Sequence, residues 1–256
     1  MASNLIHYEQ PINEKMRTLL RLEFLFANAR VMIDGATPWT SRAALLTVLD
    51  IQSILARTDI KTDMLKELER LSSLLDTWSQ RPGVDGEKLG MLLDRIDLLI
   101  DRLHSISGPL CNELKQNELL NAVRQRASIP GGACDFDMPS YHFWLSQPRE
   151  RRIFDLRSWI ATVQVVDDVT NLVLSLVRDS SPTTQEIASN GFFQQTLDPN
   201  QPYQMVRVSV AADCPFYAEI SGGKHRFSVR FLTLKLTERD TPTLESVPFG
   251  LTCCAL

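Results

Sequence analysis

The chain has 256 residues, of which 44% are hydrophobic and 23% charged, a composition typical of a folded protein with one large domain or two smaller ones. A formal net charge of −4 and an isoelectric point near 5.6 argue against a dedicated nucleic-acid binder. No apolar run reaches the roughly 18 residues that span a bilayer, and the N-terminal segment lacks the basic start and apolar core of a secretory signal. We therefore expect a cytoplasmic protein with no direct membrane insertion.

The first predicted helix covers residues 12–33, and Pro11 stands where proline favours a helix start. Apolar residues lie on more than one face of this helix, which predicts a central position in the fold. Arg17 and Arg21 are four residues apart and project together from it. Because cations on a largely buried helix need partners, these two either pair with acids of a neighbouring helix or bind an anionic ligand.

Ser41 is expected to cap a second helix that runs to about Thr58. Two longer helices follow, each with an apolar stripe at steps of three and four residues. The stripes are Met64, Leu68, Leu71, Leu75 and Trp78, and then Leu89, Leu92, Ile96, Leu99 and Leu103. The segment 80–85 between them contains a Pro-Gly pair and ends in Asp85, so it can break the first helix and cap the second. This pattern predicts a long antiparallel helical hairpin with coiled-coil-like packing.

A further helix near residues 113–128 should end at the Pro-Gly-Gly turn that begins at Pro130. Asp137 and the residues after it look like the next helix start. A long helix after Pro148 is expected to end near residue 180. From there the composition changes, and five segments read as strands separated by turn clusters such as 240–242. These segments are 190–194, 206–210, 216–220, 227–236 and 247–254.

Helices followed by strands predict an α+β fold. We expect a mainly α-helical domain with the long antiparallel helical hairpin, followed by a small antiparallel β-sheet domain. The predicted boundary lies at residue 184, with an α-helical domain at 1–184 and a β-strand domain at 185–256.

The segment 224–231 carries the strongest sign of a binding function. In a β-strand, Lys224, Arg226 and Arg230 would share one face, and the apolar residues between them would share the other. No acid lies among these cations, although the chain as a whole is acidic. The face is either a docking site for an anionic group or simply the solvated outer side of a sheet. Further candidate cations are Arg17, Arg21, Arg124 and Arg126, whereas the basic run at 149–152 looks like a solvated helix start.

The five cysteines predict neither a disulfide framework nor a metal site. Their number is odd, they form no C-x-x-C pair, and no histidine stands at zinc-like spacing from them, so we expect mostly buried, reduced thiols. The C-terminal letters CCAL loosely match a prenylation box. The residue after Cys253 is not aliphatic, however, and no polybasic stretch precedes it, which favours a hydrophobic strand end.

We find no sequence motif for catalysis, neither a phosphate-binding loop nor a zinc-protease or nucleophile motif. Asp167 and Asp168 are adjacent on a predicted helix and would point about 100° apart, so they cannot act together on one substrate. Cys134, Asp137 and His142 can be imagined as a catalytic group, but their spacing matches no template. We therefore expect no enzyme, and no cofactor or metal.

Several stretches, in order along the chain, carry a family resemblance. They are PINEKMRTLLRLEFL at 11–25, VRQRASIPGG followed by CDFD and HFWL at 123–145, NGF at 190–192, and ISG followed by KHRF and RF at 220–231. Together they closely resemble the ZapD family of FtsZ-associated bacterial cell-division proteins. The resemblance covers essentially the full length, while residues 34–60 and the helical hairpin keep only a similar pattern.

This resemblance implies a cytoplasmic homodimer at mid-cell that binds the C-terminal tail of FtsZ and bundles FtsZ filaments in the division ring. It also implies a basic pocket between the two domains. Carried over by position, the pocket residues are Arg21, His142, Arg226 and Arg230, to which we add the neighbouring cations Lys224 and Arg17. One departure is Glu118, which stands where the family has a basic pocket residue and could weaken one contact or shift the bound peptide.

Two alternatives come from other functional classes. A nucleic-acid adaptor could use the same basic patch, but the acidic isoelectric point and the lack of an aromatic-rich RNA-binding signature argue against it. An enzyme built on Cys134, Asp137 and His142 would require Cys134→Ala to change function without changing FtsZ binding.

Overall fold

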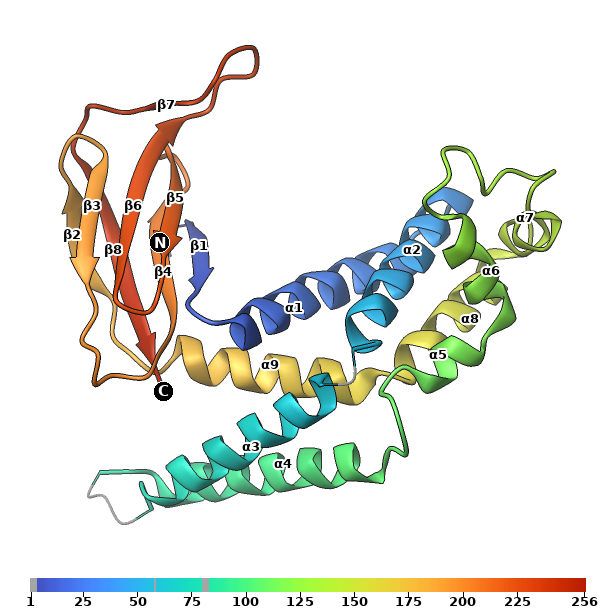
Figure 1. The fold of residues 1–256 in the computed structure, drawn as a ribbon, viewed down its shortest axis with the longest axis horizontal. Helices are drawn as coiled ribbons and strands as arrows, with labels where there is room; N and C mark the ends of the chain where they lie inside the picture. Colours follow the sequence, from blue (N-terminus) through green and yellow to red (C-terminus); the bar gives the residue numbers. More distant parts are fainter. Residues whose placement is uncertain (1–3, 58, 80–82) are drawn as a thin grey trace. The chain divides into compact units, whose positions relative to one another are not determined.

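The structure is a computed structural model that describes residues 4–57, 59–79 and 83–256 (Figure 1). The chain forms two compact units, which we describe separately. Residues 20–173 form the helical unit, while residues up to Leu19 and from Leu174 to Leu256 form the β unit. Helices and antiparallel sheets are segregated, which confirms the predicted α+β class. The β unit also contains N-terminal residues. The predicted domain boundary at residue 184 stays a prediction.

Helix α1 (Glu14–Ile33) begins later than predicted, and Pro11 is not part of it. Pro11 is the last residue of strand β1 (Leu5–Pro11), which lies at a sheet edge, where proline is tolerated. The helix is also less enclosed than the prediction of a central position implies. One stripe of it is buried, but Phe24 is 64% and Val31 71% exposed.

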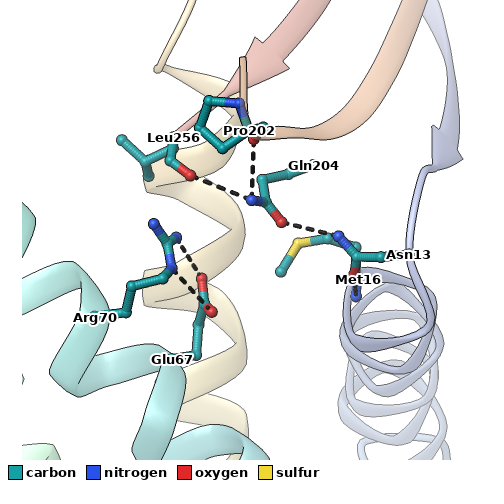
Figure 2. A network of polar contacts seen from close by, with 7 residues as sticks. All are labelled: Asn13, Met16, Glu67, Arg70, Pro202, Gln204 and Leu256. Carbon is teal, nitrogen blue, oxygen red and sulfur yellow. Dashed lines mark hydrogen bonds and ion pairs between the residues drawn. The ribbon is translucent and has the colours of Figure 1, made fainter. Parts of the chain in front are cut away.

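Asn13 links the start of α1 to the β unit. Its Oδ1 accepts a hydrogen bond from the Met16 amide at 2.9 Å, which caps the helix, and its Nδ2 donates to Gln204 Oε1 at 2.9 Å. Figure 2 shows the Gln204 amide donating in turn to the carbonyl oxygens of Pro202 and Leu256. A side-chain cap, and not Pro11, therefore fixes where α1 begins.

Helix α2 (Pro38–Leu55) begins three residues before Ser41. Thr37 is its N-cap: the Thr37 side chain accepts from the Thr40 amide at 3.1 Å, and the Thr40 hydroxyl accepts from the Thr37 amide at 3.2 Å. This capping box, with proline at the first helical position, sets the helix start, and Ser41 lies buried inside the helix. Thr58, the predicted end, lies outside the described residues.

Helices α3 (Ile60–Asp76) and α4 (Gly86–Ser105) run antiparallel and side by side, as predicted (Figure 1). Asp85 caps α4, since its carboxylate accepts from the Lys88 amide at 3.2 Å. The residues 80–82 of the predicted break lie outside the described residues. The apolar stripes are buried, apart from Leu92 and Trp78, which are half-buried.

Within α3, the buried Glu67 accepts hydrogen bonds from Arg70, the shorter at 2.7 Å, as Figure 2 also shows. Because a buried carboxylate is costly without a partner, this pair explains how an acid is accommodated in the packed face of the hairpin.

The predicted helix at 113–128 is in fact two helices, α5 (Asn112–Gln116) and α6 (Glu118–Arg126). Asn117 between them has an extended backbone, and its side chain accepts from the amide three residues on, so it caps α6 instead of continuing α5. Helix α7 (Pro139–Leu145) follows at the predicted start near Asp137, with proline at its first position.

The predicted long helix after Pro148 is also two helices, α8 (Arg149–Ala161) and α9 (Gln164–Arg178), bent by 63°. The Thr162 hydroxyl donates to the Trp159 carbonyl at 2.7 Å and so closes the last turn of α8. In the described part of the chain no single helix is long and apolar enough to cross a membrane; only this bent pair passes such a test, by length and composition.

Asp167 and Asp168 on α9 reach different helices, as their adjacency predicts. Asp167 accepts from Arg30 of α1 at 2.5 Å, and Asp168 accepts from Arg102 of α4 at 2.7 Å. The two carboxylates thus tie α9 to two neighbouring helices, and the only partner they share among the described residues is Gln164 of α9 itself, whose side-chain amide donates to both.

The basic run at 149–152 begins α8, as predicted, but one of its members is not solvated. Arg152 is only 5% exposed. Its guanidinium donates to Ser41 Oγ at 3.0 Å and to the main-chain oxygens of Ala36, Leu145 and Gln147. A single buried side chain therefore holds together the starts of α2 and α8 and the end of α7.

Replacing Arg152 by methionine should lower the free energy of unfolding by about 2–4 kcal/mol, because one buried and three partly buried oxygen atoms lose their donor. Chemical denaturation followed by far-ultraviolet circular dichroism measures this loss. Arg151→Met is the matched control: Arg151 is 63% exposed in its pair with Asp155, and such a pair contributes about 0.5 kcal/mol. Equal unfolding midpoints for the two variants would contradict this role of Arg152.

In the described residues, the β unit contains two antiparallel sheets where the sequence predicts one. Sheet A has the order β1-β4-β8-β2; sheet B has the order β3-β6-β5, with the short β7 also paired to β6. The strands other than β1 are β2 (Thr184–Ala188), β3 (Phe192–Thr196), β4 (Tyr203–Ala211), β5 (Tyr217–Gly222), β6 (Arg226–Thr233), β7 (Thr241–Pro242) and β8 (Val247–Ala255). Five of them overlap predicted segments, whereas β1, β2 and β7 were not predicted.

The sequence predicts that a strand begins at Asn190 and Gly191, but these two residues form a turn. Both have positive φ, 53° and 66°, which suits a tight turn between β2 of sheet A and β3 of sheet B. A Cβ atom at Gly191 would also lie 2.6 Å from the Thr243 carbonyl oxygen, so only glycine fits there. Strand β6 ends at Thr233 instead of 236, and the predicted turn at 240–242 contains β7.

The C-terminal cysteines lie in β8, which pairs with β4 up to Ala255. Cys254 is fully buried, and burial raises the pKa of its thiol to about 11. All five cysteines are free thiols, two of them buried and three half-buried. The hydrophobic strand end predicted for the CCAL letters is therefore confirmed.

Strand β1 is held by more than its ladder of hydrogen bonds. It pairs with β4 along its whole length, beginning with Leu5 opposite Ala211. The Glu9 carboxylate accepts from Arg178 at 2.7 and 2.8 Å and pairs with Arg207 at 3.3 Å. Because the Glu9 side chain is only 15% exposed, this ion-pair cluster fixes β1 against the rest of the β unit.

Candidate functional site

Strand β6 shows the predicted alternation of faces. Phe227, Val229 and Phe231 are at most 1% exposed and enter the core between the sheets, while Arg226 and Arg230 are exposed on the opposite face. The core fixes the direction of the two arginines, because a one-residue slip would place them inside it.

Lys224 does not lie on this strand, contrary to the prediction. Residues 223–225 connect β5 to β6, and the strand begins only at Arg226. The connection places Lys224 beside a surface hollow of about 430 Å³. Residues that line the hollow include Gln194, Ser221, Lys224, His225, Arg226 and Ser228. None of the described residues that line it carries a carboxylate.

Arg226 meets no acid on the neighbouring strands. The register places Thr196 of β3 opposite it on one side, and on the other side the Gly223 amide donates to the Arg226 carbonyl at 3.0 Å. Within the ranges that the structure describes, neither Arg226 nor Lys224 forms a salt bridge. Two cations at one end of this face are therefore free to bind an anionic group.

Arg230 has a different environment. The register places Phe192 of β3 and Glu219 of β5 opposite it on its two sides. Its guanidinium lies over the Phe192 ring, 6.0 Å from the ring centroid, which is a cation–π contact. Strand β6 itself has no acid among its cations, but the sheet does have one, because the neighbouring strand β5 supplies Glu219.

A short loop is anchored near the end of the sheet where β6 finishes. The Tyr217 hydroxyl donates to Asp240 at 2.5 Å, and this hydrogen bond raises the pKa of Tyr217 to about 12. Asp240 also accepts from the Lys235 amide at 2.8 Å. Asp240 therefore closes the base of the loop 234–240, which projects past the end of the strands in Figure 1.

The remaining predicted site residues lie elsewhere in the chain. Arg17, in the part of α1 that belongs to the β unit, pairs with Glu14 at 3.1 Å and does not line the hollow. Arg21 on α1 and His142 on α7 are exposed residues of the helical unit. The structure thus brings Lys224 and Arg226 together, with Arg230 on the same sheet face, while Arg21 and His142 stay predictions.

Glu118 is exposed and is the first residue of α6. A carboxylate at this place is favoured by the partial positive charge of a helix N-terminus. The departure from the family pattern therefore has a local structural reason.

In the imagined catalytic group, Asp137 contacts Cys134 and is also bound by an arginine. Asp137 accepts from Arg126 at 2.9 Å and from the Cys134 thiol at 3.5 Å, and His142 is exposed one turn into α7. Arg126, one of the further candidate cations, is therefore engaged. Among the described residues, no group of three or more His, Cys, Asp or Glu side chains could hold a metal ion.

Comparison with known proteins identifies the family. The family model described as "ZapD: Cell division protein" matches residues 20–230. Three relatives, all named "Cell division protein ZapD", match at least 96% of the chain. The protein of Methylococcus capsulatus is 44% identical over 99% of both chains, and that of Coxiella burnetii is 34% identical over 100% of both. The protein of Escherichia coli O17:K52:H18 is 36% identical over 96% of this chain and 98% of its own.

None of these names is that of an enzyme. Because the family model covers most of the chain and the relatives match nearly all of it, this chain belongs to the ZapD family of cell division proteins and has a role in cell division.

Proposed function

We propose that this protein binds the C-terminal tail of FtsZ through the hollow at the β5–β6 connection. The observation that carries the proposal is the pair Lys224 and Arg226, exposed beside the hollow and without an acidic partner among the described residues. Arginine and lysine bind carboxylates through charge-assisted hydrogen bonds, and arginine can do so with two donors at once. Arg230 is a further contact on the same face, and Arg17, Arg21 and His142 are predicted contacts of the same tail.

The second part of the proposal concerns assembly. A homodimer carries two copies of the site, so it can hold two tails displayed by neighbouring FtsZ filaments. The second binding event is then intramolecular, and weak individual sites give firm crosslinking through effective concentration. A monomer would bind FtsZ without bundling it. This activity places the protein in the cytoplasm at mid-cell, with the FtsZ ring.

Co-sedimentation with FtsZ filaments assembled in GTP tests the proposal. Intact FtsZ is compared with FtsZ that lacks its C-terminal tail, and the expected result is that the protein pellets only with intact FtsZ. Equal pelleting with both forms would overturn the assignment of the tail as ligand. If the protein pellets with neither form of FtsZ, the nucleic-acid adaptor becomes the leading hypothesis. A gel shift with duplex DNA and RNA then tests that hypothesis.

Binding of the tail should weaken several-fold as the salt concentration rises from about 0.05 M to about 0.5 M. Exposed charges are screened over about 8 Å at 0.15 M and over shorter distances at higher salt, so attraction by Lys224 and Arg226 declines. Titration of a labelled tail peptide by fluorescence anisotropy at several salt concentrations measures this dependence. An affinity that does not change with salt would indicate an apolar groove instead of a cationic site.

A further inference from the structure

One acid on the binding face lacks a partner. Glu219 on β5 is exposed, and the register of β5 and β6 places it directly opposite Arg230. Oppositely charged residues in this cross-strand position usually attract each other, since their Cβ atoms lie about 4.5–5.5 Å apart. Yet no salt bridge joins Glu219 to any of the described residues.

Phe192 explains why this pair does not form. Its ring lies on the side of Arg230 that faces β3, and the guanidinium packs over it at 6.0 Å from the centroid. Glu219 lies on the other side, toward β5. The cation–π contact therefore holds Arg230 away from Glu219, whose carboxylate stays available at the surface.

The two ends of the outer face of sheet B therefore differ in charge. One end carries Lys224 and Arg226 and has no acid among its described lining residues. The other end carries Glu219 beside Arg230. Arg226 and Arg230 are four residues apart on one strand, so these ends are separated by about 13 Å, which an extended peptide covers in about four residues.

We infer that Glu219 is a specificity-determining residue of this site, which accepts a basic side chain of the bound segment. This inference rests on the proposed function. A segment with only acidic groups would gain from Lys224 and Arg226 but meet repulsion from Glu219. A segment with an acidic residue at the first end and a lysine or arginine about four residues away satisfies both ends. Glu219 thus selects a mixed-charge tail over a polyanion and fixes the direction in which the tail binds.

Anisotropy titrations with a labelled synthetic peptide of the FtsZ C-terminal tail test this inference. Glu219→Gln should weaken binding about two- to fivefold, the range of a single exposed ion pair. In parallel, each lysine or arginine of the peptide is replaced by glutamine, one at a time. One replacement should weaken binding to the unmodified protein by the same factor and have no further effect on Glu219→Gln. Glu69→Gln, at an exposed position of α3, is the matched control and should leave the affinity unchanged.

Tighter binding by Glu219→Gln would overturn the inference, because Glu219 would then only repel the acids of the tail. An unchanged affinity, or basic-residue replacements that cost the same in both proteins, would overturn it as well. In each of these cases the unmodified protein binds the tail and the proposed function stands. If the unmodified protein does not bind the peptide at all, the proposed function fails and this inference fails with it.

Discussion

Arg226→Glu is expected to abolish co-sedimentation with FtsZ filaments while leaving the fold intact. The substitution removes one of the two cations at the acid-free end of the site and puts a carboxylate in its place. A hydrogen bond to a charged group contributes about 1.5–3 kcal/mol, so its loss alone weakens tail binding about 10- to 100-fold, and repulsion adds to this. Because Arg226 is exposed and its neighbours Phe227 and Val229 keep the core, the unfolding free energy should change by less than about 0.5 kcal/mol.

Two further variants make this result specific. Arg95→Glu changes the net charge by the same amount at an exposed position of α4 and should leave pelleting unchanged. Arg230→Glu should weaken binding less than Arg226→Glu, because Arg230 already lies between Phe192 and Glu219. Loss of the folded far-ultraviolet spectrum in Arg226→Glu would invalidate the explanation, and so would normal pelleting of this variant.

Deletion of residues 1–11 should unfold the β unit, or leave it too unstable to isolate. The deletion exposes the edge of β4 along the whole length of β1 and leaves Arg178 and Arg207 without the Glu9 carboxylate. Removing one partner of a fully buried ion pair costs about 3–5 kcal/mol, which is an upper bound for the partly buried Glu9 pairs, while an entire domain has about 5–15 kcal/mol of stability. The loss of strand pairing adds to this cost. Two-dimensional amide NMR spectra and chemical denaturation measure the outcome.

Two smaller changes separate the contribution of the Glu9 ion pairs from that of strand pairing. Deletion of residues 1–3 leaves every described contact of β1 in place and is the control. Glu9→Gln keeps the strand but removes the charge, and it should lower the unfolding free energy by about 2–4 kcal/mol, less than the deletion does. The proposed role of β1 would be refuted by a β unit that keeps its amide spectrum and its unfolding midpoint after residues 1–11 are removed.

The sequence predicts elements well where local chemistry decides them. The stripes of α3 and α4, the cap at Asp85 and the alternation along β6 all follow from spacing and residue type, and the structure confirms them. Errors occur where two local signals compete. Thr37 competes with Ser41 as the cap of α2, and Asn117 interrupts a helical pattern that continues on both sides of it.

Features that depend on distant residues were not readable from the sequence. Strand β1 is short and precedes a long helical region, so nothing near it indicates that its partner is β4. The same limit applies to the site. Lys224, Arg226 and Arg230 stand out within one segment, but Phe192 and Glu219 become their neighbours only through the register of three strands. A sequence scan for basic segments therefore finds the cations and misses the acid that limits them.

The pairing of β1 with β4 also has a consequence for synthesis in the cell. Leu5 can pair with Ala211 only after Ala211 has been synthesised, about 200 residues later in the chain. At translation speeds of about 5–20 residues per second, the nascent strand stays unpaired for about 10–40 s. The helical unit is continuous in sequence and can fold on the ribosome during this time. The first strand to be made is therefore among the last to be fixed, and until then it is a surface that chaperones could recognise.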